Sequence, residues 1–262
     1  MPQHILVAHD LSAEADLALR RAALLARQHA ARLTLLHVAA TPEAETAAGE
    51  QLLQRLRDSG LTGAEVRTGH GDVVAALLHQ TRGLQADLLV LGTHHRESAE
   101  GFAGTTLERV LHDSPAAVLL VAGIDPTPWQ RALAALDFSP CASRALRQAR
   151  ALLGAGASLH ALHISEVAAI HAGEDPAELT FEGELFDRLL AAEESRHDDG
   201  VQFSHELRQG ERESCLQAVL AERRPQLLAL GAHSRSQLAD ALLGSLTLEV
   251  LRQPPCDVLV VR

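Results

Sequence analysis

Short apolar runs alternate with amphipathic stretches along the whole chain of 262 residues. Residues 4–9 form an apolar run of the kind found in buried parallel strands. Residues 12–31 then repeat alanine and leucine at helical spacing behind Ser12, a residue type that caps helices. The same pattern predicts further strands at 32–38, 62–68, 86–91 and 116–122, with helices at 43–59, 72–82 and 105–112 between them. Five strands joined by four helices favour an open parallel α/β sheet.

The second half of the chain repeats the first half in the same order. Asp10-Leu11-Ser12 is matched by Asp137-Phe138-Ser139, and the apolar run at 33–38 by the run at 159–164. The separation between matched positions drifts from 127 residues at Asp10 to 140 at the last strand. A fixed order with small drifts predicts a duplicated domain with loop insertions, rather than a short-period solenoid. A longer segment near 165–200 carries an acidic helix predicted at 178–194.

A short linker at 124–130, with two prolines, divides the chain into a first domain at 1–123 and a second at 131–262. The sequence therefore predicts two tandem five-stranded α/β sandwiches. We expect the halves to pack together, because so short a linker leaves them little freedom. Their last strands could then pair across a pseudo-twofold axis, as in a homodimer formed within one chain.

Composition removes several function classes. The formal net charge of −11 argues against nucleic acid and anionic membranes as partners. All 23 Lys and Arg residues are arginine, which excludes a Walker P-loop and Schiff-base catalysis. The three cysteines are widely spaced, as expected in a reducing cytosol. We see no signal peptide and no apolar stretch near the ~20 residues of a membrane span, so the expected location is cytoplasmic.

Candidate ligand-binding groups follow the predicted strands. Ligands of open parallel sheets bind outside the carboxyl ends of the strands. The first half presents Asp10, His37-Val38 and residues 92–95 at these ends, and the second half presents their counterparts. Beyond the fourth strand of each half, a glycine and a hydroxyl residue open a helix, at Gly104-Thr105 and Gly244-Ser245. Because glycine admits an anion close to the backbone and a helix N-terminus favours phosphate, the pattern predicts a phosphate site without lysine.

On these residues, the chain resembles a tandem universal stress protein along nearly its whole length. The nucleotide signature of that family is Gly-x2-Gly-x9-Gly-(Ser/Thr) after the fourth strand. The second half keeps the spacing, with Gly231, Ser234 and Gly244-Ser245, but has serine at the second glycine. The first half has histidine at that position, His95, and a loop one residue shorter before Gly104.

The resemblance implies a Rossmann-like fold of the adenine-nucleotide alpha-hydrolase type. It also implies ATP or a related adenine nucleotide as ligand, with or without magnesium, and a role in stress signalling rather than fast turnover. The implied partners are this nucleotide and unidentified proteins, with a homodimer as a further option. The implied binding residues are Asp10, Val38, Gly92, His94, Gly104, Thr105 and Thr106 in the first half, and Asp137, Ile164, Gly231, His233, Ser234, Gly244, Ser245 and Leu246 in the second.

Three other functions stay open at this point. Substitution of both second glycines also fits a protein-interaction module that has lost nucleotide. A slow ATP hydrolase is the second, although we see no carboxylate pair and no nucleophile with its base. The third is a metal sensor using His9, His37, His94 and His95, although no zinc-motif spacing supports it and His37 and His163 read as core histidines. The intact spacing leads us to expect tighter nucleotide binding in the second half.

Overall fold

The computed structural model describes residues 1–58, 60–61, 63–93, 106–124, 126–166, 176–194, 199–232 and 243–262. The chain divides into two compact units. The first unit contains Met1–Pro128 and Cys256–Val260, and the second contains Trp129–Pro255 and Val261–Arg262.

The first unit is built on a parallel sheet with one antiparallel addition. Five strands run parallel in the order β3-β2-β1-β4-β5. Strand β10 pairs antiparallel with β5 within this unit, with Val258 opposite Leu120. The strands are β1 (His4–Ala8), β2 (Arg32–Ala39), β3 (Glu65–His70), β4 (Leu88–Gly92), β5 (Ala117–Val121) and β10 (Asp257–Val261).

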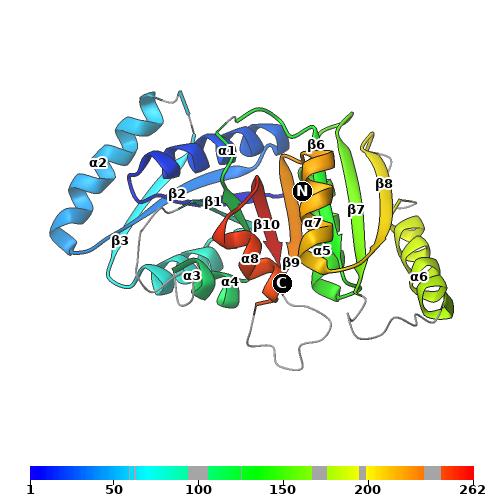
Figure 1. The fold of residues 1–262 in the computed structure, drawn as a ribbon. Helices are drawn as coiled ribbons and strands as arrows, with labels where there is room; N and C mark the ends of the chain where they lie inside the picture. The colour runs from blue at the N-terminus through cyan, green and yellow to red at the C-terminus, as the bar shows by residue number, and fades with distance from the viewer. Residues whose placement is uncertain are drawn as a thin grey trace. The chain divides into compact units, whose positions relative to one another are not determined.

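Four helices cover the two faces of this sheet. Helices α1 (Ala13–His29) and α2 (Pro42–Asp58) lie on one face, and α3 (Val73–Gly83) and α4 (Thr106–Asp113) lie on the other (Figure 1). The hydroxyl of Ser12 accepts the Ala15 N–H at 3.1 Å, so α1 begins where its cap predicts. Asp72 caps α3 in the same way, accepting the Ala75 N–H at 2.7 Å.

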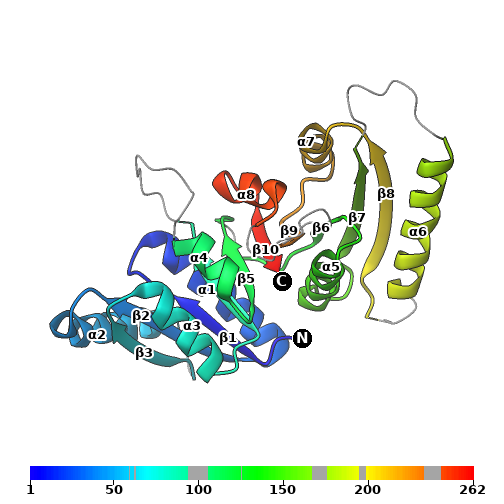
Figure 2. The ribbon, with the colours of Figure 1, turned by 90° about the horizontal axis from the view of Figure 1, so that it is seen from below.

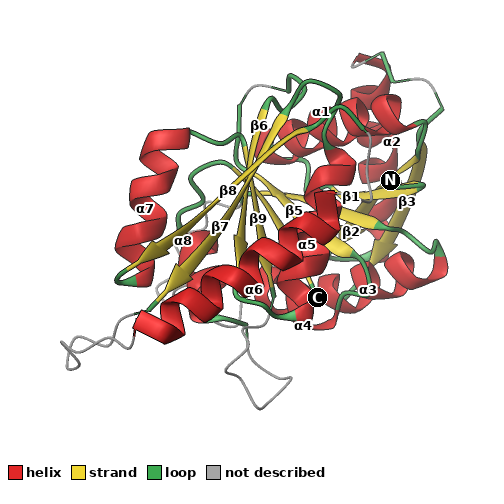
Figure 3. Ribbon diagram, turned by 90° about the vertical axis from the view of Figure 1, so that its right-hand side faces the viewer, coloured by secondary structure: helices red, strands yellow, loops and turns green. Residues whose placement is uncertain are grey.

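The second unit has the same strand order as the first. Its parallel strands run β8-β7-β6-β9, which correspond in turn to β3-β2-β1-β4. The N–H of Ala232 donates to the carbonyl of Val261 at 2.8 Å, which attaches the end of the chain to this unit. Its elements are β6 (Arg131–Leu136), α5 (Pro140–Leu152), β7 (Ser158–Ser165), α6 (Pro176–Glu194), β8 (Gln202–Gln209), α7 (Arg212–Arg223), β9 (Leu227–Gly231) and α8 (Ser245–Arg252). Helices α5 and α6 lie on one side of these strands and α7 on the other (Figures 2 and 3).

The apolar runs of the sequence form the cores. Leu6 and Val7 of β1 and Leu89 and Val90 of β4 are fully buried, as strands covered on both faces require. The fold predicted from the sequence, two tandem α/β domains with five strands each along the chain, is confirmed. Among the described residues, no helix combines the length and apolar character that crossing a membrane would require.

Candidate functional site

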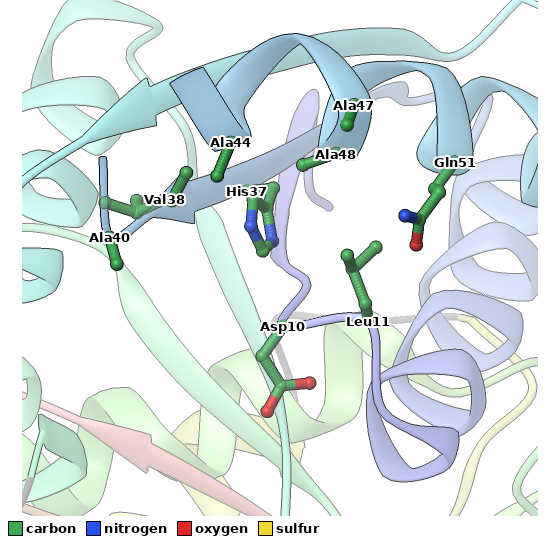
Figure 4. A pocket seen from close by; sticks show the side chains of 10 residues that line it. Asp10, Leu11, His37, Val38, Ala40, Ala44, Ala47, Ala48 and Gln51 are labelled. Carbon is green, nitrogen blue, oxygen red and sulfur yellow. The ribbon is translucent and has the colours of Figure 1, made fainter. Parts of the chain in front are cut away.

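A cavity of about 410 Å³ opens at the carboxyl ends of β1 and β2 in the first unit. Figure 4 shows the small side chains of α2 on one side of it and Asp10 and Leu11 on the other. Two of the predicted binding residues, Asp10 and Val38, meet at this one cavity. The full lining is Asp10, Leu11, His37, Val38, Ala39, Ala40, Ala44, Ala47, Ala48 and Gln51.

The loop after β1 is held by its own hydrogen bonds. Oδ1 of Asp10 accepts the backbone N–H of Ser12 at 3.0 Å and the hydroxyl of Ser12 at 2.5 Å. Leu11 between them has a φ of 70°, in the left-handed region that residues with a β-carbon rarely adopt. The aspartate-centred turn stabilises this backbone and places the Asp10 and Leu11 side chains at the cavity.

A buried histidine ties this loop to α1, and an arginine ties it to α2. Nδ1 of His9 accepts the Leu11 N–H at 3.0 Å, so its Nε2, 3.1 Å from Oδ1 of Asp16, carries the proton. Burial lowers the pKa of His9, with the neighbouring Asp16 opposing, which is consistent with a neutral ring. Arg55 of α2 binds the Asp16 carboxylate and donates to the Leu11 carbonyl at 2.8 Å. The wall made by α2 is therefore fixed to the loop after β1.

The end of β2 offers backbone groups to the cavity. The N–H of His9 donates to the carbonyl of Leu36 at 2.9 Å, so Leu36 directs its backbone groups toward β1. Because alternate residues of a strand direct these groups the same way, the N–H and C=O of Val38 also point to that side. The last β1–β2 pair is Ala8 with Leu36, so Val38 lies beyond the end of β1. Val38 thus presents a donor and an acceptor where the cavity opens.

His37 lies at the cavity and not in the core. Its side chain is half-buried and lines the cavity, and its Nδ1 donates to the carbonyl of His9 at 2.7 Å. The interpretation of this residue as a core histidine does not hold in the first unit. In the second unit it does, because His163 is 6% exposed.

The first glycine of each signature has a packing role. A β-carbon on Gly92 would lie 2.7 Å from the carbonyl oxygen of Glu14, and one on Gly231 would lie 2.8 Å from the backbone nitrogen of Ala142. Both distances are shorter than contacts that real β-carbons make. Glycine at these strand ends therefore lets the first helix of each unit approach the sheet, whatever else it does.

The second unit reproduces the loop after the first strand. Oδ1 of Asp137 accepts the Ser139 N–H at 3.0 Å, and Phe138 has a φ of 62°. Nδ1 of His163 donates to the carbonyl of Leu136 at 2.8 Å, beside Ile164 at the end of β7.

The predicted opening of a helix by Gly244 and Ser245 is confirmed, because α8 begins at Ser245 with Gly244 as its N-cap. The N–H of Gly244 donates to the carbonyl of Ala232 at 2.9 Å, so this donor is engaged within the protein. Ser245 is exposed and Leu246 is half-buried.

Part of the predicted phosphate site lies outside the described residues, namely His94, Gly104, Thr105, His233 and Ser234. Thr106, the next predicted residue, is the first residue of α4. In the part of the chain that the structure describes, no group of three or more His, Cys, Asp or Glu side chains is arranged to hold a metal ion.

Sequence reasoning missed the α2 side of the cavity. Ala44, Ala47 and Ala48 recur at the spacing of one helical face, and Gln51 continues that face. A helix face of alanines next to a predicted ligand edge was an available signal, because small side chains leave room that larger apolar ones fill.

The model of the universal stress protein family matches residues 1–122 and, a second time, residues 128–262. The chain belongs to the universal stress protein family. A universal stress protein of Mycolicibacterium smegmatis is 28% identical over an alignment of 288 positions, gaps included, and the alignment covers 98% of this chain and 96% of that relative. The universal stress protein A homolog of Pasteurella multocida is 31% identical over an alignment of 114 positions, gaps included, and the alignment covers 37% of this chain and 80% of that relative.

Solved universal stress proteins share the fold over the whole chain. A universal stress protein from Archaeoglobus fulgidus has a TM-score of 0.71 at 22% identity and covers 99% of this chain and 98% of its own. A putative universal stress protein from Pseudomonas aeruginosa has a TM-score of 0.70 at 21% identity, with coverage of 99% and 93%. At identities of 22% and 21%, this likeness shows that the fold is shared.

Proposed function

We propose that this universal stress protein binds an adenine nucleotide such as ATP in the cavity of its first unit, as a regulatory signal in the stress response. One observation carries the proposal: the Asp10 carboxylate and the backbone of Val38, both implied by the family resemblance, meet at a single cavity. Its volume of about 410 Å³ lies within the range of small-molecule sites, about 300–1,000 Å³.

The lining of the cavity suits a purine nucleoside. The alanine face of α2 and the Leu11 side chain form apolar walls for a flat ring. The N–H and C=O of Val38 form the donor and acceptor pair that an adenine edge can bind. Asp10 is exposed and can accept hydroxyl groups of a ribose. Its negative charge would repel phosphate, so the phosphates would extend away from Asp10.

The chemistry of the cavity favours binding over turnover. The carboxylate of Asp10 is engaged by Ser12, and Nδ1 of His37 is engaged by a backbone carbonyl. Both side chains are thus held by the protein rather than arranged as a nucleophile and its base. The proposed role is a ligand-dependent change in the surface that partner proteins contact.

A matched pair of substitutions on α2 tests the site. Ala47 lines the cavity and is exposed, whereas its neighbour Thr46 is exposed and absent from the lining. In Ala47→Phe, the ring fills the cavity, and we expect ATP affinity measured by isothermal titration to fall at least tenfold. Thr46→Phe places the same ring on the same helix, outside the cavity, and should keep the wild-type affinity. Equal affinities for the two variants, or no ATP binding by the wild-type protein, would overturn the proposal.

A further inference from the structure

The two units hold their equivalent histidines in the same way but surround them differently. His37 and His163 each donate from Nδ1 to the carbonyl of the residue that precedes the aspartate of the loop. His37 then faces the cavity, beside the small side chains of α2. His163 instead lies in a cluster of aromatic rings, and its side chain is 7% exposed.

Two phenylalanines form that cluster. The ring centroid of Phe138 lies 4.3 Å from that of His163, and the ring of Phe186 lies 5.6 Å from His163 and 6.2 Å from Phe138. Rings at these separations are in contact, so no further ring fits between any two of them. Phe186 is 1% exposed, although it comes from α6, the counterpart of α2.

The position of Phe138 explains why its ring covers the histidine. Phe138 occupies the place of Leu11, and the two residues share a left-handed backbone, with φ of 62° and 70°. Their side chains therefore leave the loop in similar directions. In the first unit that side chain is a wall of the cavity, whereas in the second it is an aromatic ring lying on His163.

Helix α6 also brings a carboxylate to the same cluster. Oε2 of Glu182 lies 3.7 Å from Nε2 of His163, and both atoms are buried. On the other side, the ring of Phe186 meets His205 of β8 edge-on, with centroids 5.6 Å apart. The helix is therefore seated on the strands by the very residues that cover His163.

We propose that Phe138 and Phe186 fill the second unit's counterpart of the cavity, so that the chain takes up one adenine nucleotide rather than two. This inference rests on the proposed function of the first unit. It reverses the expectation from signature spacing, because the spacing describes only the phosphate loop and the aromatic rings decide whether a base can enter.

Exchange of the deciding side chains between the units tests this inference. Isothermal titration with ATP should give one site in the wild-type protein, no site in Leu11→Phe and two sites in the double variant Phe138→Leu/Phe186→Ala. Phe181→Ala is the matched control, because Phe181 is 66% exposed on α6 and its loss should leave one site. Circular dichroism checks that each variant is folded. If the double variant unfolds, Phe138→Leu alone is the milder test, because Phe138 is half-buried.

The outcomes separate the inference from the proposed function. Two ATP sites in the wild-type protein would overturn the inference and leave the proposed function standing. Folded variants of Phe138 that still bind one ATP would do the same. No binding by the wild-type protein would overturn the proposed function. In that case, acylation of histidine by diethyl pyrocarbonate tests whether the two phenylalanines cover His163. We expect the reagent to modify His37 in the wild-type protein, and to modify His163 only after Phe138 and Phe186 are replaced. Equal modification of both histidines in the wild-type protein would overturn it.

Discussion

Breaking the buried ion pair between Arg21 and Asp257 should strongly destabilise the first unit. Asp257 begins β10 and is 1% exposed, and its Oδ2 lies 3.0 Å from Nε of Arg21, which is 3% exposed. Oδ1 accepts the backbone N–H groups of Ala122 at 3.0 Å and Gly123 at 2.8 Å. Arg21 also donates to the carbonyl of Thr127 at 2.5 Å. One carboxylate thus joins α1, β10 and the segment after β5.

The substitution Asp257→Asn keeps the shape of this side chain and removes its charge. The Arg21 guanidinium then stays buried without its carboxylate. Removal of one partner from a buried pair costs about 3–5 kcal/mol, and we expect a loss of unfolding free energy in this range. Asp113→Asn is the matched control, because the Asp113 side chain is 51% exposed in its pair with His112 and should contribute less than about 1 kcal/mol.

Urea unfolding followed by circular dichroism measures the loss, and hydrogen exchange locates it. The amides of Ala122 and Gly123 should exchange faster in Asp257→Asn, while those of the second unit keep their protection. Arg21→Met combined with Asp257→Asn should cost less than the sum of the single variants, since no uncompensated buried charge remains. A loss below about 1 kcal/mol for Asp257→Asn, with unchanged exchange at the two amides, would refute this reasoning.

Two further predictions concern stability. Gly92→Ala should lower the free energy of unfolding, measured in urea, by about 1–3 kcal/mol, because its β-carbon would stand 2.7 Å from the Glu14 carbonyl oxygen. Gly83→Ala is the control and should be tolerated, because a β-carbon there has nothing within 4 Å. Equal losses for the two variants would contradict this prediction. Burial lowers the pKa values of His4 and His9 in the folded protein, so as pH falls below about 6.5 the unfolded chain takes up protons first. The free energy of unfolding should therefore decrease from pH 7.5 to 5.5. A free energy of unfolding that rises toward acid pH would contradict the lowered pKa values of these histidines.

The order and type of the elements were predictable because their signals are local. Ser12 and Asp72 cap helices where the sequence indicates, and the apolar runs become the central strands. The weakest prediction was the strand at 62–68, observed as β3 at Glu65–His70 on the edge of the sheet. An edge strand is polar and half-exposed, so its apolar alternation is faint and its bounds shift.

The cavity itself could not be predicted, because it depends on what distant residues leave empty. The carboxyl-end rule placed Asp10 and Val38 at one edge, and the structure brings them to one cavity. Whether His37 faces a core or a cavity depends on α2, whose alanines come later in the chain. Whether Phe138 leaves space for a ligand depends on Phe186, 48 positions away and on another element. Local patterns carry no record of such packing.

The comparison of the two units shows which parts of the family signature follow from the fold. A left-handed residue after the first strand costs about 1–2 kcal/mol, and both Leu11 and Phe138 keep it although the rings of the second unit cover the equivalent histidine. Both loops present a serine that caps the first helix, and both glycines, Gly92 and Gly231, let that helix approach the sheet. We therefore attribute these features to the docking of the first helix, and we expect them to persist in a unit that binds nothing. If the first unit binds nucleotide as we propose, the side chains that fill or leave open the space beyond the loop distinguish it from the second unit.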